Sequence, residues 1–167
     1  PASADGMTGK YARIERERRF LVAAVPDVEP VADRIITDLY IDGTRMRLRL
    51  SVGTVDGGLE VVRKLTQKIP AAHGSPPGVQ GWITNTYLSE DEYERFAVLP
   101  GRWLRKRRLS IEPMGVDVFE GALAGLILAE AEFASDAEMV AFVPPEWCGR
   151  EVTGDPQYRG GNLVLRA

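Results

Sequence analysis

Charged side chains recur at even spacing in five segments of the chain, and this spacing could build a binding site for a highly charged ligand. In an extended strand, side chains two or four residues apart lie on the same face. The five sets carry both signs and are Glu15/Glu17/Arg19, Arg45/Arg47/Arg49, Lys64/Lys68, Lys106/Arg108 and Glu130/Glu132. Two interpretations are open: the sets are solvated strand faces, or they line the charged interior of a curved sheet.

A charged interior would suit a polyanion that is held together with metal ions. A triphosphate carries about four negative charges near neutrality, so it is bound best by several Arg and Lys side chains that converge from different directions. A divalent cation that bridges its oxygens needs carboxylates. Four carboxylates from two strands could hold such a cation. A barrel brings these groups together because every strand contributes side chains to the same lumen.

The composition is that of a soluble globular protein and gives no general sign of nucleic-acid binding. The 167 residues are 44% hydrophobic and 27% charged, and the formal net charge is −3. An acidic protein has no global basic field that would attract nucleic acid. The dense basic stretch 102–108 is interleaved with a strand pattern, and 110–146 contains no basic residue. We therefore expect no nucleic-acid partner.

The side chains available for metal binding favour oxygen ligands. Cys148 is the only cysteine and His73 the only histidine, so a zinc site of the usual His/Cys type is not expected. An oxygen-bound metal would be Mg²⁺, Mn²⁺ or Ca²⁺. A single cysteine excludes an internal disulfide and fits a reducing compartment, so we expect a cytoplasmic protein. No apolar run is long enough for a membrane helix, and no membrane partner is expected.

The periodicity predicts an α+β fold that is mainly antiparallel β, with an eight-stranded closed barrel, a charged interior and a few external helices. Residues 1–10 are expected to be a flexible N-terminus, with Met7 as the natural start, and 11–167 a single domain. Helices are expected at 28–36, from Ser89 to about 99 with a capping box at Glu92, and from Ser135 to 142. The tail 146–167 is expected to be mostly irregular. Strands are expected at 11–22, 38–41, 45–52, 59–69, 82–88, 103–112, 115–119 and 126–134.

Several of these segments, in the same order, resemble the CYTH superfamily, also called triphosphate tunnel metalloenzymes. The opening IERERRFLV (14–22) is similar to the ExExK signature of that superfamily. The resemblance extends over nearly the whole chain from Tyr11, and it is most specific in the C-terminal half. The further matching segments are RMRLR (45–49), KLTQK (64–68), RKRRLS (105–110), VDVFEGALAGLILAEAEF (116–133) and FVPPEWCGREVTGDPQYRGGNLVL (142–165).

The resemblance implies an eight-stranded tunnel that binds triphosphates with Mg²⁺ or Mn²⁺. By this resemblance the metal-binding carboxylates are Glu15, Glu17, Glu130 and Glu132. The triphosphate ligands are Arg45, Arg47, Lys68, Lys106 and Arg108, with Arg49 and Lys64 on the same faces. Tyr40 and Lys68 resemble a pair that activates the nucleophile or leaving group in some small bacterial members, and Arg19 stands at the lysine of the signature.

Three departures from the superfamily pattern concern catalysis. Arg19 keeps the charge of the signature lysine but cannot shuttle protons, because arginine does not titrate. Thr86 and Leu88 stand where many members have the two glutamates of an R-x-E-x-E pattern, which would weaken a second metal site. The segment YRGGN (158–162) replaces a run that commonly reads Tyr-Ser-Asn.

The function implied by the resemblance is a metal-dependent hydrolase of triphosphates, above all inorganic tripolyphosphate. Two alternatives stay open at this point. A class IV-type adenylate cyclase would need an adenine pocket at the mouth of the tunnel, and no sequence feature demands one. A non-catalytic polyphosphate or nucleotide-triphosphate binder is motivated by Thr86 and Leu88. Small antiparallel domains of this type often form homodimers, although no segment of the sequence identifies an interface.

Overall fold

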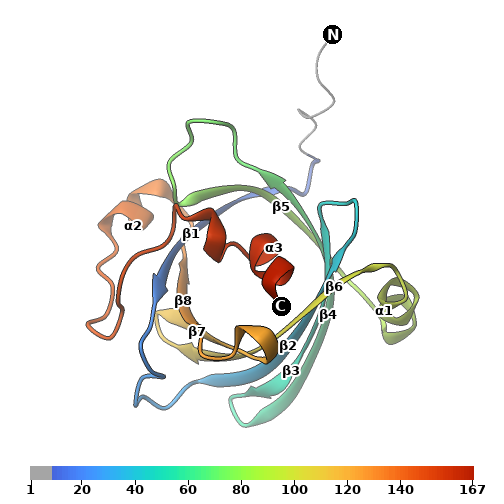
Figure 1. Ribbon diagram of the computed structural model, residues 1–167, viewed down its shortest axis with the longest axis horizontal. Helices are drawn as coiled ribbons and strands as arrows, with labels where there is room; N and C mark the ends of the chain where they lie inside the picture. The colour runs from blue at the N-terminus through green and yellow to red at the C-terminus, as the bar shows by residue number, and fades with distance from the viewer. Residues whose placement is uncertain (1–8) are drawn as a thin grey trace.

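Eight antiparallel strands close into a barrel in the computed structural model of the protein, which describes residues 9–167 (Figure 1). Around the barrel the order is β1-β5-β4-β3-β2-β6-β7-β8, so the first and last strands are neighbours. The predicted barrel is confirmed, whereas the predictions for Met7 and most of the N-terminus lie outside the described residues. The strands are β1 (Arg13–Leu21), β2 (Ala32–Ile41), β3 (Met46–Val55), β4 (Gly58–Pro70), β5 (Val79–Tyr87), β6 (Gly101–Ile111), β7 (Met114–Phe119) and β8 (Ile127–Glu132).

The helix predicted at 28–36 is wrong, because most of this segment belongs to strand β2. Val28, Val31, Ala32 and Ile35 have helical spacing, yet the chain from Ala32 onward pairs with β3 on one side and β6 on the other. Ile35, Ile36 and Thr37 are β-branched and favour the extended conformation once neighbouring strands are available. Tertiary pairing therefore overrides the local periodicity.

Helix α1 (Glu90–Ala97) lies outside the barrel and covers an apolar patch of its outer face (Figure 1). The side chain of Ser89 accepts from the Glu92 amide while the Glu92 carboxylate accepts from the Ser89 amide, so the predicted capping box is confirmed. Tyr93 and Phe96 of α1 pack against the buried residues Leu39 and Leu48. Within the described residues no helix is long and apolar enough to cross a membrane.

A second apolar cluster covers the outer face of β1, β6, β7 and β8. Phe20, Leu109 and Val116 are buried there beneath Phe142 and Trp147, which belong to the segment that follows helix α2 (Asp136–Ala141). Because the apolar residues of these strands face this outer cluster, the alternate charged residues face the lumen. The outer apolar packing therefore turns Lys106, Arg108 and Glu130 inward.

The C-terminal segment folds back into one end of the barrel (Figure 1). Leu163 and Val164 are buried against Leu104, Phe119 and Leu128, whose side chains face inward from three strands. The tail predicted as mostly irregular thus contains short helical turns, which form because they fill the apolar end of the lumen. These turns are η3 (Pro156–Tyr158), α3 (Gly160–Leu163) and η4 (Val164–Arg166), and a further turn, η2 (Gly121–Leu123), precedes β8.

Candidate active site

A cavity of about 780 Å³ opens into the charged part of the lumen. The residues predicted from the sequence that line it are Glu15, Glu17, Arg19, Tyr40, Arg47, Arg49, Lys64, Lys68, Lys106, Arg108, Glu130 and Glu132. Arg45 does not line the cavity. It precedes β3, its carbonyl accepts from the Lys68 amide at 3.0 Å, and its side chain is exposed. The role of Arg45 as a triphosphate ligand therefore stays a prediction.

On one side of the cavity, Arg19 joins two carboxylates from the first and last strands. Its guanidinium donates to Glu17 and, at 2.9 Å, to Glu130, and a third N–H donates to the backbone carbonyl of Tyr158 at 2.6 Å. Burial and the neighbouring Glu130 raise the pKa of Glu17 to about 7, although Arg19 opposes the shift. Burial would also raise the pKa of Glu130, but Arg19 and Arg108 outweigh it and hold this pKa well below its usual value.

Asp117 extends this network across β6 and β7. Its side chain is fully buried, and its two oxygens accept from Arg108 at 2.6 Å each, while Lys106 donates to one of them at 2.5 Å. Arg108 also donates to Glu130. Each cation on this side therefore has a carboxylate partner. We call this set the paired wall; it contains Glu17, Arg19, Lys106, Arg108, Asp117 and Glu130.

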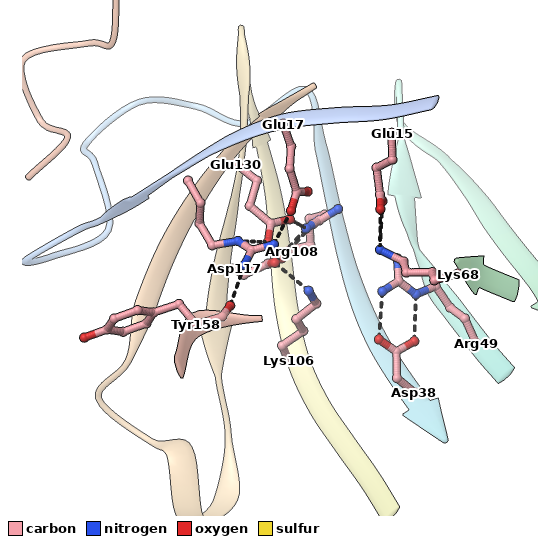
Figure 2. A network of polar contacts seen from close by, with 11 residues as sticks. Glu15, Glu17, Asp38, Arg49, Lys68, Lys106, Arg108, Asp117, Glu130 and Tyr158 are labelled. Carbon is pink, nitrogen blue, oxygen red and sulfur yellow. Dashed lines mark hydrogen bonds and ion pairs between the residues drawn. The ribbon is translucent and has the colours of Figure 1, made fainter. Parts of the chain in front are cut away.

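On the opposite side, the cations outnumber the carboxylates. The buried Asp38 accepts from Arg49 through both oxygens at 2.7 Å (Figure 2), while Arg47 Nε lies 3.8 Å from Asp38, too far for a hydrogen bond. Lys64 has no carboxylate partner within residues 9–167. Burial, together with Arg49 and Arg47, lowers the pKa of Lys64 to about 8. We call Arg47, Arg49 and Lys64 the cationic wall.

The two lysines of β4 differ in their partners. Lys68 donates to both oxygens of Glu15, at 2.8 and 2.9 Å. Lys64 faces Arg49 across the β3–β4 pairing and points into the cavity. Tyr40 also lines the cavity, and burial raises the pKa of its phenol, so this group stays protonated near neutrality. Lys68 is therefore paired with a carboxylate, whereas Lys64 is available to bind an anion.

Thr86 and Leu88 do not face the lumen. Thr86 pairs with the outward-facing Leu65, and Leu88 packs against the outer apolar cluster beneath α1. The lumen positions of β5 are Ile83 and Asn85, and Asn85 accepts a 2.7 Å hydrogen bond from Thr66. The expectation that Thr86 and Leu88 take the place of two site carboxylates is therefore wrong. The side chains that face the lumen are those of the alternate residues, one position away along the strand.

The C-terminal segment supplies part of the cavity wall. Its YRGGN run (158–162) stood out in the sequence as a departure from the superfamily pattern, but no site role was predicted for its residues. Arg159 and Asn162 line the cavity beside Gly160 and Gly161. A Cβ atom on Gly160 would lie 2.1 Å from the hydroxyl oxygen of Tyr40, so only glycine lets this segment approach so closely. The Gly-Gly pair thus serves as a packing contact with Tyr40.

Asp38 and Asp117 are the other site residues that the sequence analysis missed. Both are buried, at 1% and 0% exposure, and both hold arginines through two hydrogen bonds. Each lies in an otherwise apolar strand segment, DLYI and VDVF, as a single acid. An isolated carboxylate within a buried strand needs a cationic partner, and this was the available signal.

The carboxylates of the site have the chemistry of a hard-cation site. Glu17 faces Glu132 and Arg19 faces Glu130 in the β1–β8 pairing, so the acids of both strands meet along one seam. Within residues 9–167 no three acidic, His or Cys side chains converge closely enough to hold a metal. Lys68 and Arg19 occupy their oxygens instead. Burial, followed by the neighbouring Glu130, raises the pKa of Glu17, and a divalent cation at this carboxylate would favour its charged form.

Comparison with known proteins gives one relationship over nearly the full chain. The chain is 33% identical over 164 residues to an inorganic triphosphatase of Nitrosomonas europaea, covering 90% of this chain and 97% of that protein. It is 51% identical over 49 residues to an inorganic triphosphatase of Acetivibrio thermocellus, covering 29% and 30% of the two chains. No family model matches the sequence.

Solved structures agree with the sequence relationship. The crystal structure of the inorganic triphosphatase NE1496 matches with a TM-score of 0.58 and 29% identity, over 92% of this chain and 95% of that chain. A second crystal structure of NE1496, described as a hypothetical protein, matches with a TM-score of 0.57 and 31% identity, over 90% and 97%. The barrel described above is therefore the fold of those proteins.

Proposed function

This chain belongs to the inorganic triphosphatase family, and we propose that it hydrolyses inorganic tripolyphosphate with Mg²⁺ or Mn²⁺ inside the barrel. The observation that carries this proposal is the contrast across one cavity: Arg47, Arg49 and Lys64 lack sufficient counter-charge, and the carboxylates Glu15, Glu17, Glu130 and Glu132 line the same space. The ordered charged strands also support membership of the CYTH superfamily.

The cationic wall is the proposed binding surface for the phosphate chain. Arg47 and Arg49 come from β3 and Lys64 from β4, so their donors meet a linear anion from neighbouring strands. Arginine forks suit phosphate oxygens, and a buried cation without a full partner gains most from such a ligand. Lys106 and Arg108 of the paired wall also line the cavity and are further proposed ligands of the phosphate chain.

The carboxylates are the proposed cation ligands. Glu15, Glu17, Glu130 and Glu132 would hold Mg²⁺ or Mn²⁺ after Arg19 and Lys68 release their oxygens. The bound cation would withdraw negative charge from the phosphate oxygens during the reaction. Arg19 would then be free to face phosphate, so in this proposal it acts as a charge and never as a proton carrier.

Lys64 is the proposed proton donor to the departing phosphate oxygen. Water attacks the terminal phosphorus in line, the bond from this phosphorus to the bridging oxygen breaks, and one proton of the water passes to the phosphate that forms. The loose transition state of phosphoryl transfer places most new charge on the leaving pyrophosphate. Lys64 faces the cavity without a carboxylate partner within residues 9–167, so its ammonium group can contact the leaving oxygen once the bound anion has restored its charge. Lys68 is the alternative donor, because cation binding would free it from Glu15. Tyr40, beside Arg47 on the same surface, can donate a hydrogen bond.

The test is phosphate release from tripolyphosphate, ATP, thiamine triphosphate and long-chain polyphosphate, each with Mg²⁺ or Mn²⁺. We expect the highest kcat/KM with tripolyphosphate and no turnover in the Glu15→Gln/Glu17→Gln variant. Formation of cAMP from ATP would instead identify a cyclase. Calorimetric binding of tripolyphosphate without phosphate release from any of the four would contradict the hydrolase proposal and identify a binding protein.

A further inference from the structure

Asp38 holds a position behind the cationic wall that substrate cannot reach. It lies on β2 opposite Arg49 of β3, only 1% of it is exposed, and its side chain does not line the cavity. Both carboxylate oxygens are occupied by Arg49 Nε and a terminal Arg49 nitrogen at 2.7 Å. Burial would raise the pKa of Asp38, but Arg49 and Arg47 outweigh it, so the carboxylate stays ionised.

Asp38 accepts hydrogen bonds from Arg49 and none from Arg47. Arg47 Nε is the only buried side-chain nitrogen or oxygen within residues 9–167 that lacks a hydrogen-bond partner, and it lies 3.8 Å from Asp38. A buried donor without a partner is costly unless a ligand provides one. Arg49, held along one edge by Asp38, has a fixed orientation, whereas Arg47 lines the cavity and its Nε has no partner.

We propose that Asp38 is the positioning residue of the phosphate-binding surface: it fixes Arg49 as a rigid support and leaves Arg47 to bind the substrate. The proposal rests on the function proposed above and adds a division of labour within the cationic wall. Without the Asp38 carboxylate, Arg49 loses the two hydrogen bonds that fix its orientation and competes with Arg47 for the same space. The binding surface would then be misplaced, although no group that contacts substrate has been removed.

The chain offers a matched control for this proposal. Asp33, on the same strand as Asp38, accepts from Arg107 through the same two-oxygen fork at 2.8 and 2.6 Å. This pair lies on the outer surface of the barrel, with Asp33 39% and Arg107 51% exposed. Asp33→Asn therefore removes the same kind of charge from the same strand without touching the lumen.

The experiment compares Asp38→Asn with Asp33→Asn in steady-state hydrolysis of tripolyphosphate, after thermal melts have established that both variants are folded at the assay temperature. For Asp38→Asn we expect KM to rise about tenfold or more while kcat changes less than about threefold, the pattern of lost binding-surface geometry. For Asp33→Asn we expect both constants to stay near those of the wild type. Equal constants for the two variants would overturn the proposal.

A second variant keeps the proposal testable if Asp38→Asn does not fold. Asp38→Leu/Arg49→Met replaces the buried ion pair with apolar side chains, an exchange that folded proteins often tolerate. We expect weakened tripolyphosphate binding by calorimetry in this variant too, and wild-type affinity would overturn the role of Asp38. Absence of hydrolysis by the wild type would refute the proposed function itself, and this result is distinct from either outcome for Asp38.

Discussion

The paired wall and the cationic wall both contain arginine and lysine side chains, but these cations have carboxylate partners to different degrees. In the paired wall, Arg19, Lys106 and Arg108 meet Glu17, Glu130 and Asp117. In the cationic wall, Asp38 pairs with Arg49 and lies 3.8 Å from Arg47 Nε, and Lys64 has no carboxylate partner within residues 9–167. Buried charges need partners, so the difference identifies where a ligand anion is missing and where the protein already supplies its own.

The paired wall therefore suits a divalent cation that would replace Arg19 and Lys68 at the carboxylate oxygens. The cationic wall suits the phosphate chain. One barrel can hold both because its strands are contributed by distant parts of the chain. Three further experiments test this contrast between the walls, and the largest effect is expected in the paired wall.

Glu130→Gln should lower kcat by at least about a thousandfold, because it removes a proposed cation ligand from the centre of the paired wall. Mn²⁺ binding, followed by calorimetry, should be lost in parallel. The control is Glu151→Gln, which changes a carboxylate paired with Arg18 away from the cavity and should leave both measurements unchanged. Normal turnover in Glu130→Gln would show that this wall does not hold the cation.

Arg47→Ala should raise KM for tripolyphosphate by about a hundredfold, because it removes the least satisfied arginine of the cationic wall. Arg45→Ala should change KM less than about twofold, since this exposed side chain lies outside the cavity. Steady-state kinetics of the pair measure the effect. Similar losses in both variants would mean that Arg45 also contacts the substrate, as the spacing of Arg45, Arg47 and Arg49 predicts.

Binding of tripolyphosphate at pH 8.5 should be accompanied by proton uptake of up to about one proton at Lys64. In the free protein its pKa is about 8, so Lys64 is mostly neutral at that pH, and the bound anion raises the pKa and restores the charge. The measurement is binding enthalpy in buffers with different ionisation enthalpies, without divalent cations. Lys64→Arg should take up less, and equal uptake by both proteins would assign the proton to another group.

The architecture was predictable from the sequence because the barrel depends on a repeated pattern. Alternation in the strands around Arg47 and Glu130, and the capping box at Ser89, are local signals that the tertiary structure reinforces. The segment 28–36 failed because its helical spacing competed with strand partners far away in the chain, which local periodicity cannot represent.

The candidate site was predictable where charges repeat and was missed where they stand alone. Asp38 and Asp117 each have no second acid two residues away, so no repeat at even spacing indicates their importance. Arg159 and Asn162 approach the lumen only because the C-terminal turns fill its apolar end, a contact between segments with no periodic signature. The inward faces of β5 depended on strand register, and the assignment of Thr86 and Leu88 failed by one position.

The pairing of β1 with β8 also affects how the molecule is made on the ribosome. Glu17 reaches its neighbour Glu132 only when β8 has emerged, more than a hundred residues later in synthesis. Contacts so distant in sequence form late in folding. We expect nascent chains that end before β8 to contain the strands that carry the arginines and lysines but not the β1–β8 pairing that brings the carboxylates together. The proposed cation site would then form only when β8 closes the barrel.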